Sequence, residues 1–241
     1  KFLLIAGIAK TLGTDKLGEY GLFTVATTIL LYFIGFDYYT FSSREILDKE
    51  CNQQKWLLRD QFIFHVLSYV IIFPIVFFLY FINVISAEYM LIFISILVLE
   101  HFSQELYRIF VLLSRSLVAN FLLFIRTGLW CYIAILVWVL EINGTKDLEF
   151  LYISWAISSL LSIIISLVIL YRIYGGFFSL SNIDWSWIRR GINISLPFFI
   201  GTICYKVIEF SNRYIIDYYT NKQDVGIFVF FSSIANASQV L

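Results

Sequence analysis

Apolar runs of about 20 residues recur along almost the whole chain, and this recurrence limits the possible folds more than any other feature. As an α-helix, each run is long enough to cross a hydrocarbon core of roughly 30 Å. The composition agrees, because 60% of the residues are hydrophobic and only 14% are charged, whereas soluble domains contain about 25% charged residues. The sequence therefore predicts an all-α integral membrane protein that folds as a multi-span helical bundle.

Gly, Asn and charged clusters separate the apolar runs and predict where the helices end. The predicted helices cover 2–12, 19–40, 61–84, 88–113, 117–140, 148–174 and 191–218, and another begins near Asp224. Segments 42–60 and 175–191 are expected to be amphipathic helices in the membrane interface, or else loops anchored by tryptophan. The chain starts at Lys1 and ends at Leu241 inside apolar runs, so we expect it to be a fragment of a longer protein.

Basic residues gather on one side of the predicted bundle. The connections after the second, fourth and sixth predicted helices contain Arg44, Lys49, Lys55, Arg59, Arg108, Arg115, Arg172, Arg189 and Arg190. The other connections contain only Lys16, Lys146 and Lys222. Since cytoplasmic loops are enriched in Lys and Arg, we expect the amino end to be cytoplasmic. The formal net charge is zero, and no nucleic-acid partner is expected.

A short motif occurs twice at the start of an apolar run. EYGLF at 19–23 and DVGIF at 224–228 each follow a polar turn, and we expect their Gly to mark a turn and a tight helix start. The first two predicted helices then correspond to the seventh and eighth, which makes a repeat of six helices with a shared orientation. This predicts a two-lobed transporter with an amino-terminal lobe at 1–174, a cytoplasmic interfacial linker at 175–190 and the start of a carboxy-terminal lobe at 191–241.

Further motifs resemble those of a known family. A helix ending in LG precedes EYGLF, SSRE follows the second predicted helix, and SLPFF, NRYIIDYY and DVGIF mark the seventh and eighth. In these motifs the whole chain resembles the polysaccharide biosynthesis (oligosaccharide flippase) family of the MOP superfamily, which includes the MATE exporters. One departure is Asn212, where many relatives carry Asp before the arginine that is Arg213 in this chain.

This resemblance implies a MATE-like transporter with no catalytic residue and no cofactor. The implied activity is the movement of undecaprenyl-diphosphate-linked oligosaccharide units across the bacterial cytoplasmic (inner) membrane, by alternating access, for O-antigen or capsule synthesis. The implied partners are the lipid-linked oligosaccharide, membrane lipids and other polysaccharide-assembly proteins.

Ionisable residues inside the predicted spans are the candidate functional residues, because such residues normally face the bundle interior or a wet cavity. His101, Glu105 and Arg108 follow one another at i, i+4 and i+7, and Glu100 and Gln104 extend the same polar stripe. A second stripe combines Lys206, Glu209 and Arg213 at i, i+3 and i+7. The alternative is that Glu105 with Arg108, and Glu209 with Arg213, are self-neutralising pairs.

These residues divide by the chemistry they offer. The candidate contacts of a diphosphate headgroup are Arg126, Lys206, Arg213 and Arg44, since Arg suits forked contacts with phosphate oxygens. Arg44 could instead anchor the cytoplasmic side. Arg126 has no acidic residue at i±3 or i±4, so its partner is on another helix, in water or on the substrate. The candidates for ion or proton coupling are Glu100, His101, Glu105 and Glu209, although a satisfied contact between helices is the alternative role for His101.

Two prolines, Pro74 and Pro197, fall inside predicted helices, and Pro197 with Gly201 is a candidate hinge. The three cysteines lack metal-binding spacing, so no metal is expected.

Two other functions are possible for such a chain. A MATE-like cation-coupled drug exporter is expected to prefer an acidic cavity. A membrane glycosyltransferase or polysaccharide polymerase is expected to need a large outer loop with acid or base residues, and the predicted outer loops are short.

Overall fold

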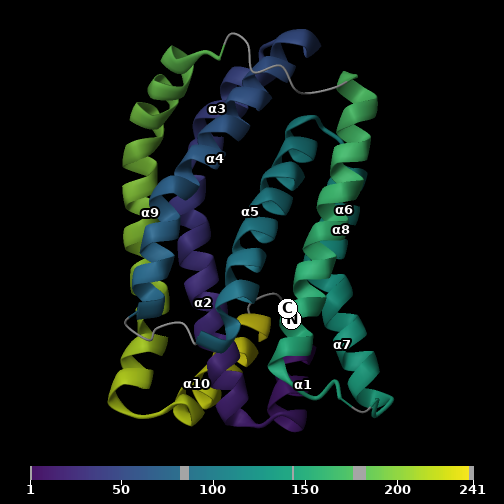
Figure 1. Cartoon of the computed structure of the whole chain (residues 1–241), viewed down its shortest axis with the longest axis vertical. Coiled ribbons are helices and arrows are strands. Elements are labelled where there is room, and N and C mark those ends of the chain that lie inside the picture. The colour runs from purple at the N-terminus through teal and green to yellow at the C-terminus, as the bar shows by residue number, and fades with distance from the viewer. Residues whose placement is uncertain (1, 82–86, 143, 176–182, 239–241) are drawn as a thin grey trace.

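The computed structural model describes residues 2–81, 87–142, 144–175 and 183–238, and these residues form helices and connecting turns without a strand (Figure 1). The helices are α1 (Phe2–Thr11), α2 (Thr14–Gly35), α3 (Tyr38–Leu47), α4 (Cys51–Phe81), η1 (Ala87–Tyr89), α5 (Met90–Leu112), α6 (Ser116–Phe124), η2 (Ile125–Leu129), α7 (Trp130–Val139), α8 (Leu148–Tyr174), α9 (Trp185–Tyr219) and α10 (Lys222–Ser238). Within the described ranges, 6 helical segments are long and apolar enough to cross a membrane. The predicted multi-span helical bundle is confirmed.

The predicted helix at 19–40 is wrong at both ends. Helix α2 begins at Thr14 and ends at Gly35, and α3 starts at Tyr38. Between them Phe36 and Asp37 both have positive φ, at 52° and 48°. This left-handed conformation ends a helix, but it is uncommon for residues other than glycine. The break was therefore not visible in the sequence pattern.

The two segments expected to be interfacial helices are instead partly absorbed into the spans. Helix α4 begins at Cys51, and α9 begins at Trp185, so only α3 and the connections remain outside them; residues 176–182 lie outside the described part. Near the start of α4 lies a buried ion pair, in which Arg59 Nη2 is 2.7 Å from Asp60 Oδ1. The other Asp60 oxygen accepts a hydrogen bond from the backbone N–H of Asp184 at 3.1 Å. Asp60 thus connects the first part of α4 to the start of α9, although its charge suggested a helix face in contact with water.

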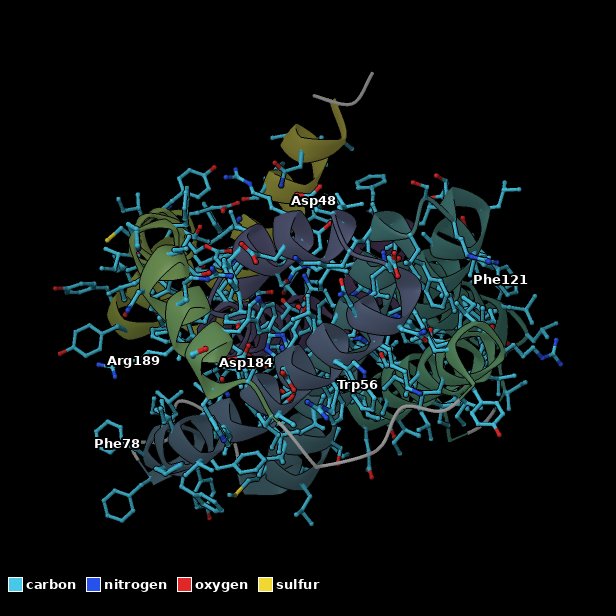
Figure 2. The ribbon with its side chains drawn as sticks, turned by 90° about the horizontal axis from the view of Figure 1, so that it is seen from above. Asp48, Trp56, Phe78, Phe121, Asp184 and Arg189 are labelled. Carbon is cyan, nitrogen blue, oxygen red and sulfur yellow. The ribbon has the colours of Figure 1, made fainter. Side chains whose placement is uncertain are left out.

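Aliphatic and aromatic side chains form the main core, which lies between α1, α2, α4, α5, α7, α8 and α10. Phe23 of α2 stacks on Tyr152 of α8, with 4.0 Å between ring centroids, and meets Phe93 of α5 edge to face at 5.1 Å. Phe78 and Phe121 instead point outward from opposite sides of the bundle (Figure 2) and are 59% and 56% exposed. Apolar side chains on the outside suit a protein whose surroundings are lipid.

Helices α2 and α10 meet through glycines at the lower end of the bundle in Figure 1. A Cβ atom on Gly18 would lie 1.9 Å from the carbonyl oxygen of Lys222, and one on Gly226 would lie 1.9 Å from that of Thr14. A Cβ on Gly21 would lie 2.6 Å from Val229 Cγ2. The glycines of EYGLF and DVGIF are therefore inside helices, where they permit close helix contact. The expectation that they mark a turn and a helix start is wrong.

The carboxylate of Asp184 caps the amino end of α9. Its Oδ1 accepts hydrogen bonds from the Ser186 hydroxyl at 2.6 Å and from the Trp187 backbone N–H at 2.9 Å. We expect Asp184→Ala to destabilise the protein by about 1 kcal/mol. Thermal unfolding in detergent should then show a lower midpoint, whereas Asp184→Asn should keep most of the cap. Equal midpoints for the wild type and the alanine variant at neutral pH would contradict this role.

The same cap should depend on pH. The hydrogen bonds from Ser186 and then Trp187 hold the pKa of Asp184 below its ordinary value. A group with a lowered folded-state pKa stabilises the fold above its ordinary pKa, and this contribution is lost as pH falls through the folded-state value. The difference between the wild type and Asp184→Ala should therefore stay constant near neutral pH and shrink in acid.

Candidate functional site

Among the described residues, the polar side chains that include the predicted site residues of the spans form three groups. The inner charge network contains Glu100, Arg126, Trp155 and Ser159. The histidine cluster contains His65, His101 and Glu105. The α9 stripe contains Lys206, Glu209 and Arg213. Arg44 belongs to none of these groups, because it is exposed in the last turn of α3, at the end of the bundle that also carries Asp48 and Asp184 (Figure 2).

In the inner charge network, the partner of Arg126 is on another helix. Arg126 Nε lies 3.6 Å from Glu100 Oε1 of α5, and both residues are 8% exposed. The other Glu100 oxygen accepts hydrogen bonds from the Trp155 indole N–H at 2.9 Å and the Ser159 hydroxyl at 3.0 Å. The Arg126 guanidinium also lies 5.8 Å from the Tyr107 ring centroid. Glu100 thus joins α5 to α8 and compensates the buried charge of Arg126.

A π-helical stretch carries Arg126. The helix predicted at 117–140 is interrupted by η2, which spans Ile125–Leu129 between α6 and α7. Such single turns change the face that a helix presents, and they are frequent at functional sites. Gly128 lies within this turn, and a Cβ there would be only 3.1 Å from the Phe124 ring. The turn places the Arg126 side chain against α5, which the apolar pattern did not predict.

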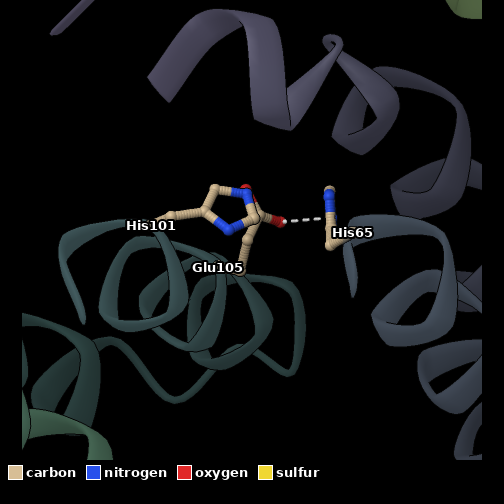
Figure 3. Close-up of side chains that lie close together, drawn as sticks. All are labelled: His65, His101 and Glu105. Carbon is tan, nitrogen blue, oxygen red and sulfur yellow. Dashed lines mark ion pairs between the residues drawn. The ribbon is translucent and has the colours of Figure 1, made fainter. Parts of the chain in front are cut away.

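The histidine cluster brings together the only two histidines of the chain (Figure 3). The rings of His65 on α4 and His101 on α5 have centroids 4.8 Å apart. His65 Nε2 lies 3.4 Å from Glu105 Oε2, which also accepts a hydrogen bond from Gln61 at 3.1 Å. Neither Gln61 nor His65 of α4 was predicted as a site residue. Their i, i+4 spacing in an apolar helix was a usable signal, since it places a polar strip on one face.

Glu105 also forms an ion pair with Arg108. This is the self-neutralising pair that the sequence offered as an alternative to a functional role. Arg108 Nη1 lies 2.6 Å from Glu105 Oε1, while the guanidinium of Arg108 is 5.3 Å from the Tyr39 ring centroid. On the other side of the cluster, His101 Nδ1 is 3.0 Å from the Tyr69 hydroxyl. The cluster is therefore held by hydrogen bonds on three sides.

The α9 stripe lies against α2. Lys206 Nζ is 2.7 Å from Glu209 Oε2 and 5.5 Å from the Tyr32 ring centroid. Arg213 Nη1 donates a hydrogen bond to the backbone carbonyl of Gly21 at 3.2 Å. Glu209 thus pairs with Lys206, whereas the alternative considered above paired it with Arg213. The Lys206 side chain is 19% exposed and that of Glu209 is 41% exposed, so both are accessible.

A cavity of about 70 Å³ lies beside the histidine cluster. It lies between α2 and α5 and is lined by Thr28, Leu31, Tyr32, Gly35, Asp37, His101, Gln104, Glu105 and Arg108. Tyr32 borders the cavity and also contacts Lys206. Tyr32 therefore lies between this cavity and the Lys206 side chain of the α9 stripe. A second cavity of about 320 Å³ between α4, α5 and α8 is mainly apolar, with His65 and Glu105 in its wall.

Pro197 and Gly201 lie within α9, which runs without interruption from Trp185 to Tyr219. A Cβ on Gly201 would meet no atom within 4 Å. Between the two residues, Phe199 stacks on Phe36 with 4.4 Å between ring centroids, so α9 packs on the break between α2 and α3. The use of Pro197 and Gly201 as a hinge stays a prediction.

Comparison with known protein families gives one finding. The family model described as polysaccharide biosynthesis protein matches residues 1–241, which is the whole chain. No curated protein and no solved structure matches. The fold and the site are therefore interpreted from the family match and from the geometry of the chain itself.

Proposed function

The chain belongs to the polysaccharide biosynthesis protein family, a flippase family of the MOP superfamily, and we propose from this that it moves undecaprenyl-diphosphate-linked oligosaccharides. Transport would be from the inner to the outer leaflet of a bacterial cytoplasmic membrane, with the amino end in the cytoplasm. The protein would act as a transporter without covalent chemistry, for O-antigen or capsule synthesis, and could work with other polysaccharide-assembly proteins.

The observation that carries this proposal is the partly exposed cation Lys206, which contacts Tyr32 in the wall of the cavity that Arg108 also lines. A diphosphate carries more negative charge than the Glu209 carboxylate that Lys206 holds at 2.7 Å, so it can displace that carboxylate. Hydrocarbon offers no such compensation for the headgroup. We therefore propose Lys206 as the main headgroup contact.

The other candidate cations would contact the headgroup at different stages of its movement across the membrane. Arg44, exposed at the cytoplasmic end of α3, would capture the headgroup. Arg213 is held by the carbonyl of Gly21 and would contact the headgroup from the α9 stripe. Arg126 is enclosed with Glu100, so it would reach the headgroup only when this ion pair opens. Opening and closing of the pair would couple substrate binding to the packing of α5 on α8.

Alternating access requires two units that move against each other. We propose an amino-terminal lobe at 1–174 and a carboxy-terminal lobe that begins at 191, connected by 175–190. The glycine contact between α2 and α10 would then close the outer end, and bending at Pro197 and Gly201 would help to open it. Glu100, His101, Glu105 and Glu209 remain the candidates for ion or proton coupling.

Cation-coupled drug export is the second function that the fold allows. An exporter of cationic drugs needs an available acidic group in its cavity. In the described part of the chain, Glu100, Glu105 and Glu209 each lie within 3.6 Å of Arg126, Arg108 or Lys206. These pairs occupy the three glutamates with cations, which favours an anionic substrate. Asp37 is the feature that suits a cationic one, because it lines the cavity of about 70 Å³ and its Oδ2 has no hydrogen-bond partner among the described residues.

Replacement of Lys206 tests this proposal. A charge-assisted contact contributes about 1.5–3 kcal/mol, which corresponds to roughly a 10- to 100-fold change. Lys206→Ala should therefore reduce transport by about this factor, while Lys206→Arg should retain much of it. The measurement is the amount of surface polysaccharide in a deletion strain that expresses each variant.

The matched control is Arg189→Ala, because Arg189 is an exposed cation at the other end of α9 and points away from the bundle (Figure 2). This control should support normal polysaccharide levels. Full export by Lys206→Ala, at equal membrane expression, would remove Lys206 from the site.

A further inference from the structure

We propose that His65, His101 and Glu105 bind one divalent transition-metal ion of the Zn²⁺ type between α4 and α5. Their candidate ligand atoms all lie within 4.8 Å of one another. The three residues are 2%, 1% and 6% exposed, so water does not compete for them freely. This inference does not depend on the proposed transport function, because metal binding can be measured without a substrate.

The surroundings of His101 orient it as a metal ligand. The Tyr69 hydroxyl lies 3.0 Å from Nδ1 and can accept a hydrogen bond from the N–H there. Nε2 then carries a free lone pair. This atom is buried and has no hydrogen-bond partner among the described residues. A histidine that is anchored through one ring nitrogen and leaves the other free is the usual arrangement of a metal ligand.

His65 and Glu105 complete the set from two helices. His65 Nε2 lies 3.4 Å from Glu105 Oε2 (Figure 3), while its Nδ1 is buried without a hydrogen-bond partner in the described ranges. Gln61 and Arg108 hold the two Glu105 oxygens at 3.1 Å and 2.6 Å. A buried nitrogen without a hydrogen-bond partner destabilises the fold, and a bound metal ion would remove at least one of these two penalties.

The donor set determines the class of metal. Two imidazoles and one carboxylate form a known Zn²⁺ ligand set, and imidazole also suits Cu²⁺ and Ni²⁺. Mg²⁺ and Ca²⁺ prefer oxygen ligands alone. Ligands around a tetrahedral Zn²⁺ are about 3.3 Å apart, whereas the candidate atoms lie within 4.8 Å of one another, so the cluster must contract on binding by up to about 1.5 Å. The cavity of about 70 Å³ next to His101 and Glu105 has room for a water as fourth ligand.

A metal ion at this site would link α4 to α5 through its ligands. The apolar cavity of about 320 Å³ lies between these two helices and α8, so side-chain packing there is incomplete. Since His65 belongs to α4 and the other two ligands to α5, the ion would bridge this gap. A ligand that binds only the folded state raises its stability, and Zn²⁺ should therefore raise the unfolding temperature.

Spectroscopy of the purified protein tests the proposal, with an affinity tag that contains no histidine. Because the chain contains two histidines, ¹⁵N-histidine labelling yields only two sets of ring signals. One equivalent of Zn²⁺ should shift both sets together, and Co²⁺ should give the visible absorption of a tetrahedral site. His101→Gln should weaken binding roughly 100-fold or more, and Tyr69→Phe roughly tenfold.

Gln104→Ala is the matched control, since Gln104 lines the same cavity but supplies no ligand to the cluster. This variant should bind Zn²⁺ as the wild type does. The NMR result on the wild type decides the question even if a histidine variant does not fold. Histidine signals that stay unchanged with Zn²⁺, or a thermal shift of equal size in His101→Gln, would overturn the proposal and indicate adventitious binding.

Discussion

Replacement of Gly226 by alanine is expected to force α10 away from α2 and to abolish polysaccharide export. The new Cβ would lie 1.9 Å from the carbonyl oxygen of Thr14. That oxygen belongs to the backbone, so no side-chain rotation relieves the clash. Overpacking of a side chain costs about 1–3 kcal/mol, and displacement of a whole helix should cost more. Gly18→Ala should have the same effect, because its Cβ would meet the carbonyl of Lys222 at the same distance.

The control for this prediction is Ile227→Ala on the same helix, because Ile227 is 41% exposed. Membrane expression, thermal unfolding and surface polysaccharide should be compared for the three variants. Unchanged unfolding and export in Gly226→Ala would show that α2 and α10 do not meet as described.

Removal of the Glu100 carboxylate is the second change with a large expected effect. Glu100→Ala leaves the 8% exposed Arg126 without its ion-pair partner and also removes the acceptor of the Trp155 and Ser159 hydrogen bonds. Removing one partner of a buried ion pair costs about 3–5 kcal/mol. We expect poor accumulation in the membrane and a much lower unfolding midpoint in detergent.

A double-variant cycle separates the charge from the hydrogen bonds. Glu100→Gln keeps an acceptor for Trp155 and Ser159 but removes the negative charge. If the loss of stability in Glu100→Gln comes from the unpaired charge of Arg126, then removal of that charge should restore part of the stability. The double variant Glu100→Gln with Arg126→Met should therefore be more stable than Glu100→Gln alone. Additive losses in the double variant would show that the two side chains do not interact.

The spans and the polar stripe of α5 could be predicted because both follow from local periodicity. Apolar runs separated by Gly, Asn and charged clusters identified the membrane spans, and the i, i+4 spacing of His101 and Glu105 placed these two residues on one face. The sequence limited the partner of Arg126 to another helix, water or the substrate, because its own helix has no acidic residue at i±3 or i±4. Which of these possibilities holds depends on tertiary contacts that a sequence pattern does not contain.

Three features of the structure could not be predicted from the sequence, for physical reasons. The break at Phe36 and Asp37 uses left-handed backbone at residues that rarely adopt it. The π turn at Ile125–Leu129 leaves no mark on the apolar pattern. The meeting of His65 with His101 joins residues of two helices, and only the packing of α4 near α5 brings them together.

The most direct test of the account is the location of the lipid-linked oligosaccharide in a strain that lacks this gene. If the protein is a flippase, undecaprenyl-linked units should accumulate in the inner leaflet, protected from a glycosidase added outside spheroplasts, and surface polysaccharide should be lost. Expression of the wild-type gene should restore both. Unchanged surface polysaccharide combined with altered drug sensitivity would contradict the account and favour the exporter.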